Sequence, residues 1–180
     1  MYIDLFQDFL FGALASIGFA VIANTQLKAL PYCGIIAGAG HAARFMWMHN
    51  GGGIVAGSFA GATVIGVLAV LCSRMARTPA ESLSFPALLP MIPGMYAYKA
   101  VHAAIGCMQS GGEEQFDHSI YLLLYNASTT FFVILSMVLG ITLPVFALKK
   151  MTFEATREKK CYGTKTNTLL YKGRRDSQFL

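Results

Sequence analysis

Charged residues are scarce in this chain, and their scarcity excludes most classes of soluble protein. Only 13% of the 180 residues are charged, 55% are hydrophobic, and the mean hydropathy is +0.53. Soluble domains carry about 25% charged residues, so a soluble enzyme is not expected. Several charge-free runs approach the roughly 20 residues that a helix needs to cross a bilayer. The composition therefore predicts an integral membrane protein of the all-α class.

Motifs for catalysis, nucleotide binding and metal binding are also missing from the sequence. It has no Walker motif, no dinucleotide fingerprint and no evident pairing of a nucleophile with a base. The four cysteines show no CxxC spacing and resemble small core residues; they are Cys33, Cys72, Cys107 and Cys161. We therefore predict no enzymatic activity, no cofactor and no metal. The start of the chain lacks the positive charge of a signal peptide, so no cleaved leader is expected.

Basic residues are concentrated at one end of the chain. Residues 149–180 contain nine Lys and Arg and three acids, whereas 109–118 contains three acids and no Lys or Arg. Because short basic loops stay in the cytoplasm, we expect the tail and the loop bearing Arg74 and Arg77 inside, and 109–118 outside. The sequence thus predicts a helical bundle over 1–148 and a basic cytoplasmic tail over 149–180. A charged tail without a basic folded face gives no reason to expect a nucleic-acid partner.

Five charge-poor segments are predicted to cross the membrane. Five crossings place Lys28 inside and the N-terminus outside. The second segment could instead lie at the interface, which would leave four spans, and the fifth is long enough to be tilted or bent. The segments are 5–23, 32–48, 54–73, 84–108 and 119–148.

The fourth segment is predicted to be broken at Pro90, Pro93 and Gly94. Two prolines three apart, followed by glycine, do not fit an unbroken helix. Non-helical backbone at membrane depth must face protein or a water-filled cavity. A half-helix starting near Gly94 would point unpaired N–H groups inward, which suits a carboxylate, and Lys99 could add positive charge. The alternative is a simple packing kink.

Three ionisable residues interrupt the first two segments. His41 and Arg44 are three apart and share a helix face. Arg44 either faces the interior, because an arginine in lipid is costly, or extends to the headgroups beside Trp47; both remain open. Asp8 could balance Arg44 or carry a proton, or it could be a solvated residue at a helix end.

Polar and small residues mark further helix faces. In the fifth segment, Asn126, Thr129 and Thr130 either line a polar substrate path or bond back to their own helix. Small residues four apart predict close packing of helices, within this chain or with another subunit; the pairs are Gly34 with Gly38, Gly57 with Gly61, and Ala62 with Gly66.

Taken together, these segments resemble the small, YjjB-like subunit of the threonine/serine exporter (ThrE-type) family over most of residues 5–148. The resemblance rests on four pieces in order, with Tyr98 after the last: QD at 7–8, GFA at 18–20, GHAAR at 40–44 and LPMIPG at 89–94. It implies a multi-pass subunit of the bacterial inner membrane that joins a larger, YjjP-like subunit. It also implies export of threonine and serine, or of a dicarboxylate such as succinate in some two-subunit members.

We therefore expect a secondary-transport subunit that exports a small carboxylate-bearing solute. The expected substrate-binding residues come from the break and the polar helix faces: His41, Arg44, Pro90, Pro93, Gly94, Tyr98, Lys99, Asn126, Thr129 and Thr130. Asp8 is the expected group for proton or charge coupling. Further copies of the chain are possible partners. The alternative, from another class, is a scaffold subunit whose partner contains the whole pathway.

Overall fold

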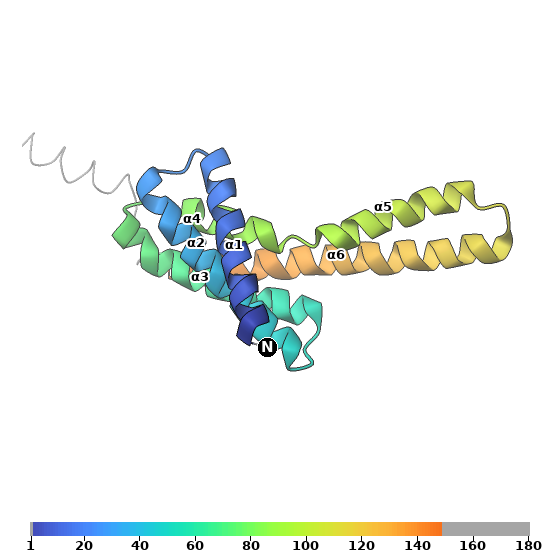
Figure 1. Ribbon diagram of the computed structural model, residues 1–180, viewed down its shortest axis with the longest axis horizontal. Coiled ribbons are helices and arrows are strands. Elements are labelled where there is room, and N and C mark those ends of the chain that lie inside the picture. Colours follow the sequence, from blue (N-terminus) through green and yellow to red (C-terminus); the bar gives the residue numbers. More distant parts are fainter. Residues whose placement is uncertain (1, 149–180) are drawn as a thin grey trace, which may run out of the picture.

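The computed structural model describes residues 2–148, and all regular structure in this part of the chain is helical (Figure 1). The all-α prediction is confirmed, whereas the predicted basic tail and Cys161 lie outside the described residues. The elements are α1 Tyr2–Ile22, η1 Leu27–Ala29, α2 Leu30–His49, α3 Ile54–Ala76, α4 Ala80–Leu88, η2 Leu89–Met91, α5 Gly94–Gln109 and α6 Glu113–Ala147.

Three of these helices are long and apolar enough to cross a membrane: Ile3–Ile22, Ile54–Ala76 and Glu113–Ala147. The predicted count of five is not reproduced by this criterion. The second predicted span is α2, which is rich in glycine and carries His41 and Arg44. The fourth is divided into α4 and α5 by the proline-containing turn η2.

The helix boundaries follow local sequence signals. Pro31 lies in the first turn of α2, where its missing N–H costs no hydrogen bond. The fifth predicted span was expected to begin at residue 119, but α6 begins at Glu113. Glu113 and Glu114 occupy its first turn, where negative charge favours the positive end of the helix dipole. The expected outer loop therefore contracts to the three residues between α5 and α6.

The helices form a packed group and a projecting hairpin. Helix α1 packs on α2, α2 on α3, and α3 on the second half of α6, with α4 against α1, α2 and α3. Helices α5 and α6 form an antiparallel hairpin that extends away from this group (Figure 1). The largest fully buried side chains lie in the packed group and include Ile36, Ile65, Leu83, Met91 and Val133.

Glycines set the close approach between the packed helices. A Cβ added at Gly38 would lie 2.7 Å from the ring of Phe9, and one at Gly66 would lie 2.6 Å from Pro144. Such distances leave no room for a larger residue, so the predicted small-residue faces are confirmed as helix contacts.

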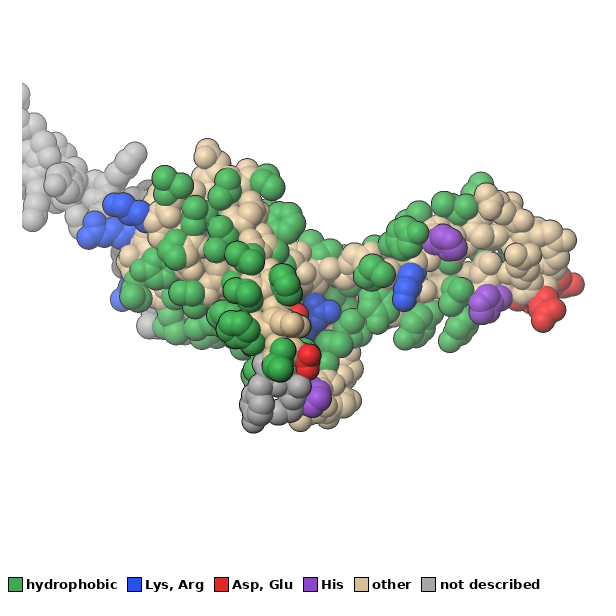
Figure 2. Space-filling model, in the orientation of Figure 1, with side chains coloured by type: hydrophobic (Ala, Val, Ile, Leu, Met, Phe, Trp, Pro, Cys, Tyr) green, Lys and Arg blue, Asp and Glu red, His purple; other side chains and the backbone are tan. Residues whose placement is uncertain are grey.

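Helices α3 and α6 run in the same direction. Gly140 lies against Phe59 and Ala62, and Gly66, further along α3, lies against Pro144, further along α6. The C-terminal ends of both helices therefore lie at one end of the molecule. Charge follows the same axis: Lys and Arg gather at the end opposite the hairpin tip, and the acids of the 109–118 segment lie at the tip (Figure 2).

Candidate functional site

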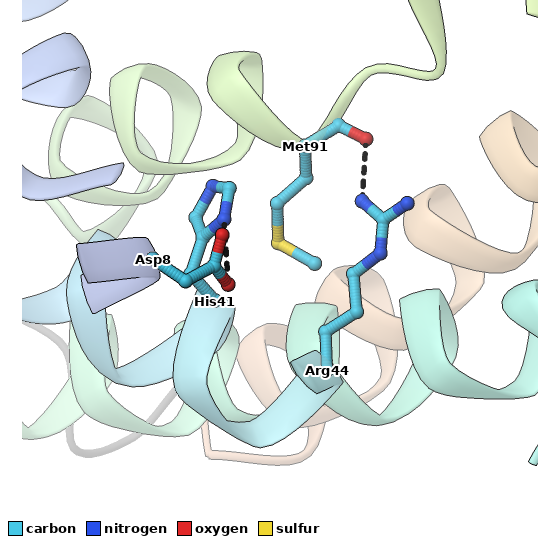
Figure 3. Close-up of polar contacts among 4 residues, drawn as sticks. All are labelled: Asp8, His41, Arg44 and Met91. Atoms are coloured by element: carbon cyan, nitrogen blue, oxygen red, sulfur yellow. Dashed lines mark hydrogen bonds and ion pairs between the residues drawn. The ribbon is translucent and has the colours of Figure 1, made fainter. Parts of the chain in front are cut away.

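Charged and polar side chains from α1 and α2 meet the broken segment in one layer of the packed group. Asp8 lies near the start of α1, Arg44 near the end of α2, and Gly61 near the start of α3. Each lies within about 11 Å of its helix end at ~1.5 Å per residue. Figure 3 shows Asp8 beside His41, and Met91 between His41 and Arg44. Three helices and η2 thus build one polar site near the end of the packed group that faces the hairpin.

Arg44 binds the backbone of the broken segment. Its Nη1 donates a hydrogen bond to the carbonyl oxygen of Met91 at 3.0 Å (Figure 3). In a continuous helix the Met91 carbonyl would accept from the N–H of Met95. The chain is interrupted between η2 and α5, so this carbonyl is available to a side chain. The interior interpretation of Arg44 is therefore the correct one of the two left open, and α2 continues past it to His49.

A glycine on α3 makes room for this contact. A Cβ added at Gly61 would lie 2.6 Å from Met91 Cε and 3.2 Å from Arg44 Cβ. The close approach of α3 holds the stem of Arg44 and the Met91 side chain together. The four-residue spacing of Gly57 and Gly61 marked this face as a contact, but nothing in the sequence indicated that Arg44 and Met91 meet there.

His41 and Asp8 form the second polar contact of the site. Nδ1 of His41 lies 3.7 Å from Oδ2 of Asp8, an ion pair when the imidazole is protonated (Figure 3). The His41 side chain is 12% exposed and that of Asp8 is 41% exposed. Nε2 of His41 is buried and has no hydrogen-bond partner among the described residues. A buried imidazole with one paired and one unpaired nitrogen can take up or release a proton when the site rearranges.

The His41 ring fits because α1 carries a glycine opposite it. A Cβ added at Gly12 would lie 2.7 Å from His41 Cδ2. Gly12 lies one helical turn after Asp8, so the two residues face α2 together. Sequence reasoning identified Asp8 and His41 separately but missed Gly12, because a single glycine gives no periodic signal.

The amides of the break do not behave as predicted. The N–H of Gly94 donates to the carbonyl of Ile92 at 2.8 Å, and those of Tyr96 and Ala97 donate to the carbonyl of Pro93 at 3.1 Å. The expectation of unpaired N–H groups is therefore wrong for these three, because the turn closes on itself, whereas the N–H of Met95 has no hydrogen-bond partner among the described residues. The break provides a carbonyl acceptor at Met91, which Arg44 already occupies.

The other predicted site residues either lie apart from the contact between Arg44 and Met91, or their side chains donate hydrogen bonds to their own helix backbone. Tyr98 and Lys99 are exposed on α5. Asn126, Thr129 and Thr130 each donate to the carbonyl four residues earlier on α6, at 2.7–2.9 Å. Of the two interpretations of this cluster, bonding to its own helix describes these contacts. Their part in substrate binding stays a prediction.

The site combines charged groups of both signs. Within residues 2–148, no group of three or more His, Cys, Asp or Glu side chains is placed to hold a metal ion. One guanidinium, one carboxylate and one imidazole lie in neighbouring contacts. This set suits recognition of a small molecule with both positive and negative groups.

Comparison with known proteins shows which family the chain resembles. Residues 8–147 match the family described as "Threonine/Serine exporter, ThrE". A protein of Haemophilus influenzae, described as uncharacterized, is 33% identical over 142 residues, which are 79% of this chain and 47% of that protein. The chain thus spans about half the length of the curated relative that it matches. No solved structure matches the chain.

Proposed function

The chain belongs to the threonine/serine exporter (ThrE) family, and from this membership we propose that it is a membrane subunit of an exporter of threonine and serine. The family predicted from the sequence is confirmed, and the match covers every residue of the polar site from Asp8 onward. The exporter family and the apolar helices identify a membrane protein. The solute and the role of the subunit are our proposals.

The observation that carries the proposal is the balance of charge at the site. Arg44 and Asp8 supply one positive and one negative group, and an amino acid presents one carboxylate and one ammonium. The guanidinium of Arg44 would exchange the Met91 carbonyl for the substrate carboxylate, a stronger, charge-assisted partner. The half-exposed carboxylate of Asp8 would take the ammonium. An arginine in an apolar helix is costly unless it is paired, which is consistent with a functional role.

A dicarboxylate such as succinate fits this site less well. A dianion calls for two cationic groups. The second cation considered from the sequence, Lys99, is exposed on α5, and a protonated His41 would be paired with Asp8. Asp8 would repel the second carboxylate. We therefore favour a zwitterionic amino acid over a dicarboxylate.

A hollow at the opposite end of the packed group supports uptake from the cytoplasm. It has a volume of about 660 Å³ and lies between the α1–α2 turn and the start of α4. Its lining includes Asn24, Gln26, Thr78, Glu81 and Ser82. This is the end that bears Arg74 and Arg77, which the positive-inside rule assigns to the cytoplasm. We propose that the solute reaches the site from this side.

The proposed setting is the bacterial inner membrane, with the C-terminal end of α6 on the cytoplasmic side. In this arrangement α1, α2, α3, the combined α4–η2–α5 segment and α6 make the five crossings. Non-helical backbone at the α4–α5 junction is tolerated because it is buried in protein, as Met91 and Pro93 are. A larger membrane subunit is proposed to complete the pathway, in keeping with a relative in which the matched residues make up only 47% of the length.

Replacing Arg44 tests the proposal directly. Cells that produce the chain with its larger subunit would be loaded with labelled threonine, and efflux would be followed. Hydrogen bonds to charged groups contribute ~1.5–3 kcal/mol, so Arg44→Ala should weaken apparent affinity roughly 10- to 100-fold. Lys28→Ala removes an exposed cation from the turn before α2 and is the matched control. Normal efflux in Arg44→Ala would reject the assigned role.

The scaffold alternative is tested by water access to the break. In a cysteine-free chain, Ile92→Cys places a thiol on an exposed position next to Met91, and Leu14→Cys places one on the exposed apolar face of α1. A transport subunit should react with a water-soluble maleimide at position 92, should be protected there by threonine, and should not react at position 14. An unreactive position 92 in assembled, exporting cells would favour a scaffold.

A further inference from the structure

Asp8 supplies the counter-charge on which a protonated His41 depends. Nδ1 of His41 lies 3.7 Å from Oδ2 of Asp8, whereas Nε2 is buried and has no hydrogen-bond partner among the described residues. Little space is left for the ring to turn away, because a Cβ added at Gly12 would lie 2.7 Å from its Cδ2. An imidazolium that lost Asp8 would therefore remain as an unpaired, largely buried charge, which is costly.

Within the described part of the chain, two charges act on this imidazole. They are the carboxylate of Asp8, from α1, and the guanidinium of Arg44, from its own helix. Arg44 donates to the Met91 carbonyl, and the Met91 side chain lies between Arg44 and His41 (Figure 3). Helix η2 carries no titratable residue, and the charged residues of α3 and α4 lie near the end of α3 and the start of α4, away from the site. The protonation of His41 is therefore coupled chiefly to the state of Asp8.

The same carboxylate is the proposed partner of the solute ammonium. This step rests on the proposed function, in which Arg44 takes the carboxylate of an amino acid and Asp8 takes its ammonium. Asp8 and His41 lie side by side, so an ammonium bound to Asp8 comes close to the imidazole as well (Figure 3). Two neighbouring positive charges disfavour each other. By linkage, solute binding disfavours the protonated ring, and protonation of the ring disfavours solute binding to the same degree.

We propose that His41 is the proton-coupling residue of this exporter, and that its proton and the ammonium of the solute compete for Asp8. Without solute, the imidazolium is paired with Asp8. When the ammonium takes Asp8, the N–H bond at Nδ1 breaks, its electron pair stays on the nitrogen, and the proton passes to water. Asp8, the group predicted from the sequence for coupling, stays ionised throughout and acts as the shared counter-charge.

This competition couples the two movements across the membrane. The ring takes up a proton on the outer side after the solute has left, and it releases the proton on the inner side when the next solute binds. One amino acid therefore leaves for each proton that enters. A proton gradient directed into the cell then drives export, because the protonated site and the solute-loaded site exclude each other.

Threonine accumulation in vesicles tests the coupling. The full-length chain and its larger subunit would be reconstituted, with the membrane potential held at zero by potassium and valinomycin. If the interior is more acidic by about one pH unit, exchange of one proton for one solute should accumulate labelled threonine about tenfold inside. Exchange of labelled for unlabelled threonine, without a pH gradient, is measured in parallel.

His41→Gln separates proton coupling from solute movement. Glutamine can donate a hydrogen bond to Asp8 but does not titrate. This variant should still exchange threonine, at a reduced rate, but its accumulation should fall from about tenfold to none. A purely structural role of His41 would lower both measurements together. The matched control is His49→Gln at the exposed end of the same helix, which should accumulate and exchange threonine as the wild type does.

The possible failures are distinguishable. Accumulation by His41→Gln that equals the wild type, or wild-type vesicles that exchange threonine without accumulating it, would overturn the coupling and leave the proposed function intact. Wild-type vesicles that do neither would overturn the proposed function and this coupling with it. Should His41→Gln lose exchange as well, the wild-type complex in weakly buffered detergent solution decides. Saturating threonine should release protons there, and an unchanged pH would reject the proposal.

Discussion

At the scale of single residues, Gly61 and Gly12 determine whether the polar site can form. Arg44 reaches the Met91 carbonyl because α3 offers no side chain at position 61, and His41 lies against α1 because position 12 offers none. Interiors are packed as densely as organic crystals, so even one added methyl group displaces its neighbours. The polar contacts of Arg44 and His41 therefore depend on two glycines that have no functional side chain.

Adding a methyl group at position 61 should damage the site. Gly61→Ala places a Cβ 2.8 Å from the backbone carbonyl oxygen of Gly40, as well as against Met91 Cε, and should cost about 1–3 kcal/mol of stability through overpacking. Thermal unfolding of the purified protein and threonine efflux both measure the effect. Gly18→Ala is the matched control, because nothing lies within 4 Å of the position and alanine favours the helix. Equal unfolding temperatures for the two variants would contradict this account.

At the scale of elements, the break between α4 and α5 offers a carbonyl, that of Met91, to the side chain of Arg44. The proline pattern at 90 and 93 correctly predicts that the helix is interrupted, because the missing N–H is a local property of proline. It does not predict the hydrogen bonds inside the turn, which close the N–H groups of Gly94, Tyr96 and Ala97 on nearby carbonyls. Only the tertiary packing, in which η2 lies against α1 and α4 and α4 lies against α2, brings Arg44 to Met91.

Restoring helix geometry at the break should abolish export. Pro93→Ala supplies an N–H, allows a continuous helix, and would let the Met91 carbonyl accept from Met95 as in any helix. Arg44 would then lose its backbone partner. We expect efflux to be lost while the amount of protein in the membrane is unchanged. Pro86→Ala, in α4 outside the break, should retain efflux, and retained efflux in Pro93→Ala would contradict the expectation.

At the scale of the whole molecule, the basic and acidic residues are separated along the direction in which α3 and α6 run. Helices α3 and α6 run in the same direction, so their C-terminal ends point to the same end of the molecule, away from the acidic hairpin tip (Figure 2). This separation matches the asymmetry that orients helical membrane proteins. The basic end is therefore the one that the positive-inside rule assigns to the cytoplasm.

The orientation can be measured with impermeant thiol reagents on intact cells. In a cysteine-free chain, Gly111→Cys at the exposed hairpin tip should be labelled in intact cells. Arg77→Cys should be labelled only after the membrane is opened. The opposite pattern would reverse the proposed topology, and with it the assignment of the polar hollow near Gln26 to the cytoplasmic side.

The sequence by itself determined the membrane class, the helical structure, the interrupted fourth segment, the close-packing glycine faces and the family. Each depends on composition, local backbone chemistry or short-range spacing. Only the tertiary structure decided that His41 meets Asp8, that Arg44 meets the Met91 carbonyl, and that α5 and α6 project as a hairpin. The reason is physical: the rotation and crossing of packed helices depend on contacts between residues far apart in the chain, and hydropathy does not record them.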